Sequence, residues 1–237
     1  MTKLSVNLNK VALLRNQRDC GYPSVLKTAE LVIQSGAHGI TVHPRPDERH
    51  IRKLDVPELA DFVSHHPSIE YNIEGYPSED FIDMVCSVKC HQVTLVPDAP
   101  GQKTSDHGWN VDKHFYFLCD VVGRIQSSGA RVSLFIDPTP DMAIRAADTG
   151  AKRVELYTGL YFDGSVGLAA YRSTADTAAK RGLGINAGHD LNLDNLQAFI
   201  QAVPYCAEVS IGHAITSDAL IMGWPTAIKE YLNRLQK

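Results

Sequence analysis

Residues 131–159 read RVSLFIDPTPDMAIRAADTGAKRVELYTG and contain two short apolar runs with a helix-like segment between them. The runs Arg131–Asp137 and Arg153–Gly159 are rich in the β-branched and aromatic residues that buried strands favour. Asp141–Asp148 has helical periodicity, and Gly150 follows it at the position where many helix ends take a left-handed glycine. The stretch therefore predicts a strand, a helix and a second strand parallel to the first, joined by a right-handed crossover.

The same alternation occurs eight times along the chain. The expected strands are Leu4–Asn9, Gly39–Pro44, Ile69–Glu74, Gln92–Asp98, Arg131–Asp137, Arg153–Gly159, Gly184–His189 and Ala207–His213. The expected helices are Ser24–Ser35, Val56–His65, Ser78–Val88, Val111–Ser128, Asp141–Asp148, Leu168–Arg181, Leu193–Ala202 and Ser217–Leu235. Eight steps in 237 residues average about 30 residues each, the size of a minimal step. We therefore predict a single α/β domain over residues 1–237, a closed TIM (β/α)8 barrel, with an open doubly wound sheet as the alternative.

Composition narrows the class of protein. With 44% hydrophobic and 21% charged residues, the chain is globular rather than disordered. The net charge of −4 gives no bulk basic surface for nucleic acid. The five cysteines lack disulfide-framework spacing and are interpreted as reduced thiols. No secretory apolar region follows Met1, and no apolar run approaches the roughly 18 residues of a membrane helix. We expect a cytoplasmic enzyme without a membrane or nucleic-acid partner.

Polar side chains stand where the expected strands end. They are Asn7, Asn9, His43, Arg45, Glu74, Asp98, Asp137, Glu155, Tyr157, His189 and His213. The carboxyl ends of barrel strands carry the active site of this fold, so the pattern predicts catalysis. The amino ends, such as Ala130-Arg131 and Lys152-Arg153, are expected to be solvated and not to converge. Asp137 precedes Pro138 and is interpreted as a turn residue.

Two of these residues are carboxylates within strands that are expected to be buried. Glu74 and Glu155 each need a partner or a shifted pKa to lie in the mouth of a barrel. Such groups suit general acid and base catalysis.

Two groups of residues are typical of phosphate binding. Gly188-His189 and Gly212-His213 end the last two strands, where glycine lets backbone N–H groups approach an anion. The segment from Arg45 to His50 offers a guanidinium fork, although a charged surface loop is the alternative because Asp47 and Glu48 offset it. The sequence thus predicts phosphorylated ligands.

Neither a metal site nor an enzyme imine is strongly indicated. The sequence has no His-x-His on the first strand and no His-Glu-x-x-His, and Cys86 and Cys90 stand without a second pair, so no metal is expected. Lys10, just past the first strand, is the one lysine placed to form a Schiff base.

Several ordered motifs carry a family resemblance that covers nearly the whole chain. They are Asn7-Leu8-Asn9-Lys10, Leu14-Arg15-Asn16, Gly39-Ile40-Thr41-Val42-His43 with Arg45 and Arg49-His50, Asn72-Ile73-Glu74, Leu95-Val96-Pro97, Ser133–Asp137, Asn186-Ala187-Gly188-His189 and Ile211–Ile215. In these motifs the sequence resembles the pyridoxine 5′-phosphate synthase family. The resemblance implies an octameric TIM barrel that condenses 3-amino-2-oxopropyl phosphate with 1-deoxy-D-xylulose 5-phosphate. The products would be pyridoxine 5′-phosphate, phosphate and water, formed without a metal or an organic cofactor.

The resemblance also implies roles for individual residues. His43 and Glu74 match proton acceptors, His189 matches the proton donor, and Glu155 matches a carboxylate that stabilises charge in the transition state. Positions that hold the aminoketone phosphate match Asn7, Arg18, Gly212 and His213, and Asp190 is expected among the substrate-binding residues. Positions that hold the deoxyxylulose phosphate match Asn9, Lys10, Arg45, His50 and Thr104.

The sequence departs from the family pattern at four positions. Asn9 and Lys10 stand in place of an Asp-His pair, Tyr157 in place of a histidine, and Asp190 in place of a glycine. Phosphate or hydroxyl binding survives the change at residues 9 and 10, whereas a proton-transfer role there does not. Asp190 adds negative charge beside the expected phosphate site.

Two other functions stay open, and one loop suggests motion. The enzyme alternative is another barrel that condenses or isomerises a sugar phosphate, by a Schiff base on Lys10. The alternative that is not an enzyme is a barrel that binds a phosphorylated metabolite as a sensor, which leaves Glu74 and Glu155 unexplained. The longest polar loop, Pro97–Asn110, follows the fourth strand, and Asp98–Asn110 is hypothesised to close over the substrates as a lid.

Overall fold

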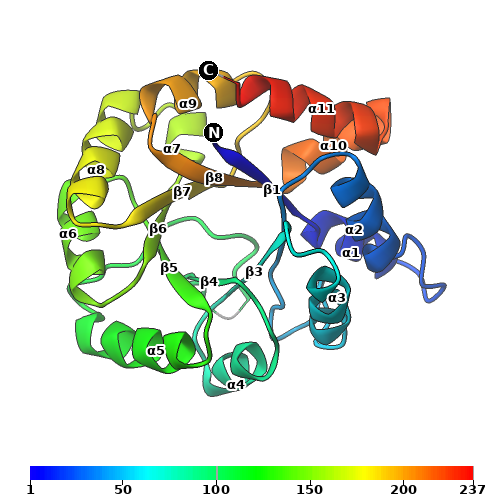
Figure 1. Cartoon of the computed structure of the whole chain (residues 1–237), viewed down its shortest axis with the longest axis horizontal. Helices are drawn as coiled ribbons and strands as arrows, with labels where there is room; N and C mark the ends of the chain where they lie inside the picture. Colours follow the sequence, from blue (N-terminus) through cyan, green and yellow to red (C-terminus); the bar gives the residue numbers. More distant parts are fainter. Residues whose placement is uncertain (100, 237) are drawn as a thin grey trace.

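The computed structural model describes residues 1–99 and 101–236, and within these the strands form one closed barrel (Figure 1). Every neighbouring pair of strands is parallel, and the last strand pairs with the first. The strands are β1 (Lys3–Asn7), β2 (Gly39–Val42), β3 (Glu70–Gly75), β4 (Gln92–Leu95), β5 (Arg131–Ile136), β6 (Arg153–Tyr157), β7 (Gly184–Gly188) and β8 (Cys206–Ile211). The closed TIM barrel is therefore confirmed, and the open sheet is excluded.

The helices form a ring outside the barrel (Figure 1). They are α1 (Asn9–Arg15), α2 (Val25–Gln34), α3 (Asp55–Ser64), α4 (Glu79–Ser87), α5 (Phe115–Ser127), α6 (Pro140–Asp148), α7 (Gly159–Phe162), α8 (Leu168–Lys180), α9 (Leu196–Ala202), α10 (His213–Met222) and α11 (Trp224–Arg234). Among the described residues, none of these helices has the length and apolarity needed to cross a lipid bilayer.

The structure differs from the expected elements in several places. The first strand ends at Asn7 rather than Asn9, because the Asn7 Oδ1 atom accepts the Asn9 N–H at 2.9 Å and turns the chain into α1. The short helices α1 and α7 were not expected. The last expected helix, Ser217–Leu235, is two helices, which are divided at Gly223 by its φ of 79°.

Alternation along the strands separates an apolar outer layer from a polar interior. Leu4, Val6, Ile40 and Val42 are fully buried apolar residues on β1 and β2. The alternate positions are polar, and their hydrogen bonds cross the barrel from strand to strand. These bonds join Ser5 to Thr41 at 2.7 Å, Asn72 to Thr41 at 3.4 Å, Thr94 to Asn72 at 3.1 Å and Thr94 to Glu155 at 3.3 Å. The polar interior leads upward to the carboxyl ends of the strands, where the site lies.

The amino ends of the strands do converge, contrary to expectation. Lys3 Nζ lies 2.6 Å from Glu70 Oε1, and Arg131 pairs with the other oxygen of the same carboxylate. Arg153 Nη1 lies 3.9 Å from Glu208 Oε2. Although burial raises the pKa of Glu70, hydrogen bonds from Lys3 and Arg131 outweigh it and hold that pKa at about 2. Closing the sheet brings these ends together, and the ion pairs cover the floor of the barrel.

Candidate active site

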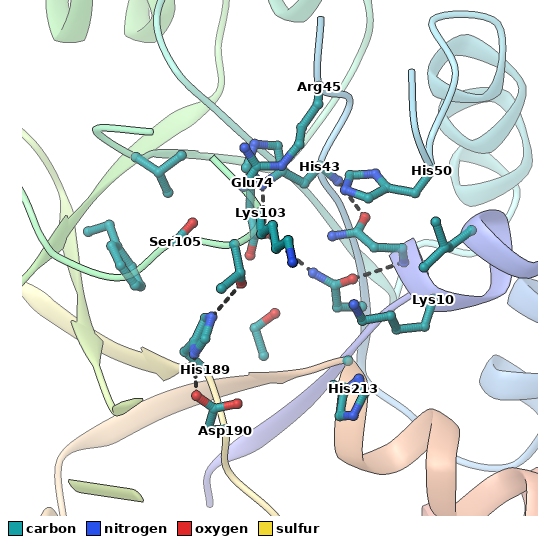
Figure 2. A pocket seen from close by; sticks show the side chains of 18 of the residues that line it. Lys10, His43, Arg45, His50, Glu74, Lys103, Ser105, His189, Asp190 and His213 are labelled. Carbon is teal, nitrogen blue, oxygen red and sulfur yellow. Dashed lines mark hydrogen bonds and ion pairs between the residues drawn. The ribbon is translucent and has the colours of Figure 1, made fainter. Parts of the chain in front are cut away.

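A cavity of about 590 Å³ opens at the carboxyl ends of the strands (Figure 2). Of the residues expected to form a site, the cavity is lined by Asn7, Asn9, Lys10, His43, Arg45, His50, Glu74, Thr104, Glu155, His189, Asp190, Gly212 and His213. The structure therefore brings together, in a single pocket, residues that lie far apart in the sequence.

Arg18 is the expected site residue that does not line the cavity. It lies beyond the end of α1 and is exposed to solvent. Arg15, on the last turn of α1, is buried instead and donates to the Asp55 carboxylate at 2.6 and 2.9 Å and to the His50 carbonyl at 3.1 Å. The arginine of α1 that supports the pocket from within this chain is therefore Arg15, which holds the backbone of His50.

His43 and Glu74 face each other at the ends of neighbouring strands. His43 Nδ1 lies 3.9 Å from Glu74 Oε2, and the two side chains are 7% and 12% exposed. Asn7 Nδ2 donates to the same Glu74 oxygen at 3.3 Å. Asn9 Oδ1 accepts the backbone N–H of His43 at 2.9 Å. Asn9 therefore positions the histidine, besides lining the cavity.

Burial shifts both groups of this pair away from the charged state. Burial, together with the positive charge of Arg45, holds the pKa of His43 well below its usual range. Burial and the neighbouring Glu155 carboxylate raise the pKa of Glu74. His43 is thus a neutral imidazole that can accept a proton, and Glu74 becomes a strong base once it has lost its own.

Glu155 lies deeper in the barrel, on β6, and is 3% exposed. Thr94 Oγ1 donates to its Oε2 atom at 3.3 Å. Burial, followed by the charge of Glu208, raises the pKa of Glu155 to about 8. A Cβ atom on Gly188 would overlap Glu155 Oε1, so this glycine makes room for the carboxylate. The expectation that Gly188 brings its backbone close to an anion stays a prediction; in the structure this glycine is buried against Glu155.

The loop after β4 reaches over the cavity through a buried ion pair. Arg45 pairs with Asp98, and Ser105 Oγ donates to the same Asp98 oxygen at 2.8 Å. The other oxygen, Asp98 Oδ1, is buried without a hydrogen-bond partner. Lys103 and Ser105 line the cavity beside Thr104, and sequence reasoning did not single them out. The sequence feature that could have indicated them is the long polar loop in which they lie. Pro100, within the expected lid, lies outside the described residues.

His50 is held as a neutral hydrogen-bond donor. Its Nδ1 atom accepts the backbone N–H of Ile51 at 2.9 Å, so any proton on the neutral ring is at Nε2. Burial and the charge of Arg45 lower the pKa of His50 to about 4. Asp98 offsets Arg45, and Asp47 lies 2.6 Å from Arg49 Nη2, so the lysines that line the cavity without an ion pair in the described residues are Lys10 and Lys103. Arg49 was not among the expected binding residues.

His189 and Asp190 follow β7 and touch each other. The Nδ1 atom of His189 lies 2.6 Å from Asp190 Oδ2, and its Nε2 atom lies 2.7 Å from Thr104 Oγ1 (Figure 2). The ring of Tyr157 meets the His189 ring edge to face at 5.3 Å. His189 therefore connects the end of β7 to the loop after β4.

The amino end of α10 offers a place for an anion. Gly212 is the residue before the helix, and no side chain caps the first turn. Unpaired N–H groups and the helix dipole favour a negative charge there. A Cβ atom on Gly212 would lie 3.0 Å from Asn7 Cβ, so glycine permits the close packing of this turn against β1. His213, on the first turn, is exposed and lines the cavity.

Asp137 was interpreted as a turn residue, and its backbone carbonyl accepts the Thr139 N–H at 2.7 Å. Its Oδ1 atom accepts the Gly108 N–H at 2.9 Å, which holds the loop after β4 against β5. In the part of the chain that the structure describes, no three His, Cys, Asp or Glu side chains are grouped as metal ligands would be.

Comparison with known proteins identifies close relatives over the full length. The sequence profile of the family described as “Pyridoxal phosphate biosynthesis protein PdxJ” matches residues 4–237. A protein of Chelativorans sp. (strain BNC1) named “Pyridoxine 5′-phosphate synthase” is 51% identical, over 98% of this chain and 97% of its own. A Bacteroides thetaiotaomicron protein of the same name is 51% identical over 100% of both chains.

Solved structures with low sequence identity share the fold. Phosphoribosyl anthranilate isomerase from Thermotoga maritima superposes with a TM-score of 0.63 at 15% identity, over 99% of this chain and 98% of the other. Mycobacterium tuberculosis tryptophan synthase superposes with a TM-score of 0.68 at 13% identity, over 100% and 93%. These likenesses concern the barrel alone.

Proposed function

Because the chain belongs to the PdxJ family of pyridoxal phosphate biosynthesis proteins and is an enzyme of vitamin B6 biosynthesis, we propose how its pocket performs the reaction. The substrates are 3-amino-2-oxopropyl phosphate and 1-deoxy-D-xylulose 5-phosphate, and the products are pyridoxine 5′-phosphate, inorganic phosphate and water. The activity is that of a pyridoxine 5′-phosphate synthase, the name carried by relatives that are about half identical to this chain.

The observation that carries the proposal is the placing of acid–base groups between two regions suited to phosphate. Figure 2 has Arg45, His43 and His50 on one side of the cavity and His189, Asp190 and His213 on the other. The aminoketone phosphate binds at Gly212 and His213, at the start of α10. The deoxyxylulose phosphate binds near Arg45, His50, Lys10 and Thr104. Holding both molecules in one cavity removes much of the entropic barrier to their condensation.

The chemistry consists of successive proton transfers. The substrate amine attacks the substrate ketone, so the imine needs no enzyme lysine. His43 and Glu74 accept protons, and His189 donates a proton to oxygen that leaves as water. The Glu155 carboxyl supports charge that develops near the floor of the cavity. Asn9 cannot titrate, which leaves proton transfer to the strand-end histidines and carboxylates.

We also infer the wider setting of the enzyme. Residues 1–237 act as a single catalytic domain, in the cytoplasm, as a homo-octamer, which the family resemblance implies. Leu14 on α1 is 51% exposed, and Leu220 and Ile221 on α10 are 75% and 85% exposed. Such apolar residues on the outer surface support association with further copies of the chain.

A direct assay tests the proposed function. Purified protein mixed with both substrates in metal-free buffer should form pyridoxine 5′-phosphate, which is followed by its absorbance or fluorescence. Folded protein that binds both substrates without turnover would support the sensor alternative. Borohydride treatment with either substrate alone should leave Lys10 unmodified, whereas a trapped adduct on Lys10 would support the Schiff-base alternative.

A further inference from the structure

Two consecutive residues at the end of β7 have left-handed backbones. The φ angles of His189 and Asp190 are 85° and 58°, and in the described residues Glu48 is the other non-glycine residue with positive φ. Such a conformation is costly for residues with a Cβ atom and persists where surrounding contacts hold it. Aspartate tolerates it better than most residues. Both strained residues line the pocket, and one of them, His189, is the residue proposed to donate a proton.

The left-handed turn brings the Asp190 carboxylate back onto the neighbouring ring. Asp190 Oδ2 lies 2.6 Å from His189 Nδ1, a short, charge-assisted distance. The hydrogen bond from His189 lowers the pKa of Asp190, so the carboxylate stays ionised at neutral pH. Since an ionised carboxylate can only accept, the proton of this hydrogen bond belongs to Nδ1 of the imidazole.

The second ring nitrogen is thereby directed to the reaction. With Nδ1 protonated, Nε2 is the atom that gains and loses a proton. It faces Thr104 Oγ1 at 2.7 Å, on the loop that covers the cavity. In the neutral ring the Thr104 hydroxyl donates to Nε2, and in the charged ring Nε2–H donates to its partner.

We propose that Asp190 is a positioning residue for His189. Its carboxylate fixes the Nδ1–H tautomer of the imidazole and aims Nε2 at the substrate oxygen that leaves as water. The proposal rests on the proposed function, in which His189 is the proton donor. In the step itself, the Nε2–H proton passes to the departing oxygen and the ring becomes neutral with Nδ1–H still bonded to Asp190. The carboxylate does not change its protonation state.

Other charged and titratable groups surround this pair. Tyr157 on β6 contacts the His189 ring, the positive charge of Lys10 on α1 acts on Asp190, and His213 on α10 lines the same cavity. Lys103 lines the same cavity from the loop after β4. In the described residues Asp190 is the hydrogen-bond partner of His189 Nδ1 and Thr104 is that of Nε2, so the Nδ1 side of the ring is oriented by Asp190.

Two substitutions separate the hydrogen bond from the charge. Asp190→Gly removes the carboxylate while glycine accepts the φ of 58° without strain. Asp190→Asn keeps an acceptor oxygen and a residue that tolerates this backbone but removes the charge. Asp194→Asn is the matched control, because Asp194 is exposed in the same connection to α9 and its removal changes the net charge equally.

The first measurement is steady-state kinetics over pH. We expect Asp190→Gly to lower kcat by about 10-fold or more, with the basic limb of the kcat profile moved to lower pH, because the imidazolium loses its partner. Asp190→Asn should fall between Asp190→Gly and the wild type, and Asp194→Asn should match the wild type. A change confined to KM would instead assign Asp190 to phosphate binding and overturn the proposal.

The second measurement needs no turnover. Nitrogen-15 NMR of the histidine side chains should find neutral His189 as the Nδ1–H tautomer in the wild type and as a mixture or the Nε2–H tautomer in Asp190→Gly. If the wild type has no synthase activity but the His189 tautomer still differs between the wild type and Asp190→Gly, the proposed function is contradicted and the positioning role stands. An unchanged tautomer in Asp190→Gly overturns the role of Asp190 whatever the activity.

Discussion

At the scale of single residues, the site depends on titratable groups that are kept out of water. Glu74, Glu155 and His43 lie within one barrel mouth, and burial is the main cause of the pKa shift of each. Burial raises the pKa of each carboxyl group and lowers that of His43, so the pocket holds carboxyl groups that keep a proton more readily and a neutral imidazole, as a condensation through several proton transfers requires.

Substitution of the strand-end carboxylate tests its role as a base. Glu74→Gln keeps the size of the side chain and its contact with Asn7 but cannot accept a proton. We expect kcat to fall by about 10²-fold or more while phosphate binding persists, since general base catalysis typically supplies that factor. Glu58→Gln, on the exposed face of α3, is the control. Near-normal turnover of Glu74→Gln would remove Glu74 from the mechanism.

A second residue-scale prediction concerns the space beside Glu155. Gly188→Ala adds a methyl group where the carboxylate lies, so either Glu155 or β7 must move. We expect a lower melting temperature and a loss of activity of about 10-fold or more. Gly167→Ala is the control, because nothing lies within 4 Å of a Cβ atom there and the φ of −79° suits alanine. Equal melting temperatures and activities for the two variants would show that the space at Gly188 has no importance.

At the scale of elements, the loop after β4 is held to the cavity by Asp98. This carboxylate bonds both Arg45 and Ser105, and it is buried. Asp98→Asn should weaken both contacts and leave Arg45 without a counter-charge, which favours an open loop. We expect faster proteolytic cleavage between residues 101 and 110 and a higher KM for the deoxyxylulose phosphate.

The control for this prediction is Asp112→Asn, which removes a surface partner of Arg145 beyond the loop and should change neither measurement. Both substrates together should protect the wild-type loop from the protease. Cleavage at equal rates with and without substrates would contradict closure of the loop as a lid.

At the scale of the whole molecule, the buried carboxyl groups make stability depend on pH. The folded-state pKa of Glu155 is about 8, above its usual 4.5, so the folded protein holds a proton that the unfolded chain releases between these values. The associated stability is complete below about pH 4.5 and is lost as the pH rises through about 8.

We therefore expect the urea midpoint of unfolding to decrease between pH 5 and 8, and to decrease less in Glu155→Gln, whose amide never ionises. The difference between the two proteins is the measured quantity, because Glu74 and His50 titrate in both. Parallel curves for the two proteins would mean that Glu155 ionises as freely in the folded state as in the unfolded chain.

The sequence by itself determined the barrel and most of its site. Eight alternating strands and helices favoured a closed barrel over an open doubly wound sheet, and parallel strands in a closed barrel must bring their carboxyl ends together. His43, Glu74 and His189, at the ends of different strands, were therefore predictable as neighbours. Ordered motifs over the whole chain indicated the family, and the family profile confirmed it.

Only the tertiary structure decided which groups touch one another in the mouth of the barrel. The close approach of Glu155 to Gly188, the hydrogen bond from His189 to Asp190 and the contact of Arg15, rather than Arg18, with His50 all depend on the turns that follow the strands. The ion pairs of the amino ends likewise appear only when the sheet closes. The physical reason is that periodicity specifies which face of an element is buried, whereas contacts between elements depend on backbone angles and strand register, which no local pattern encodes.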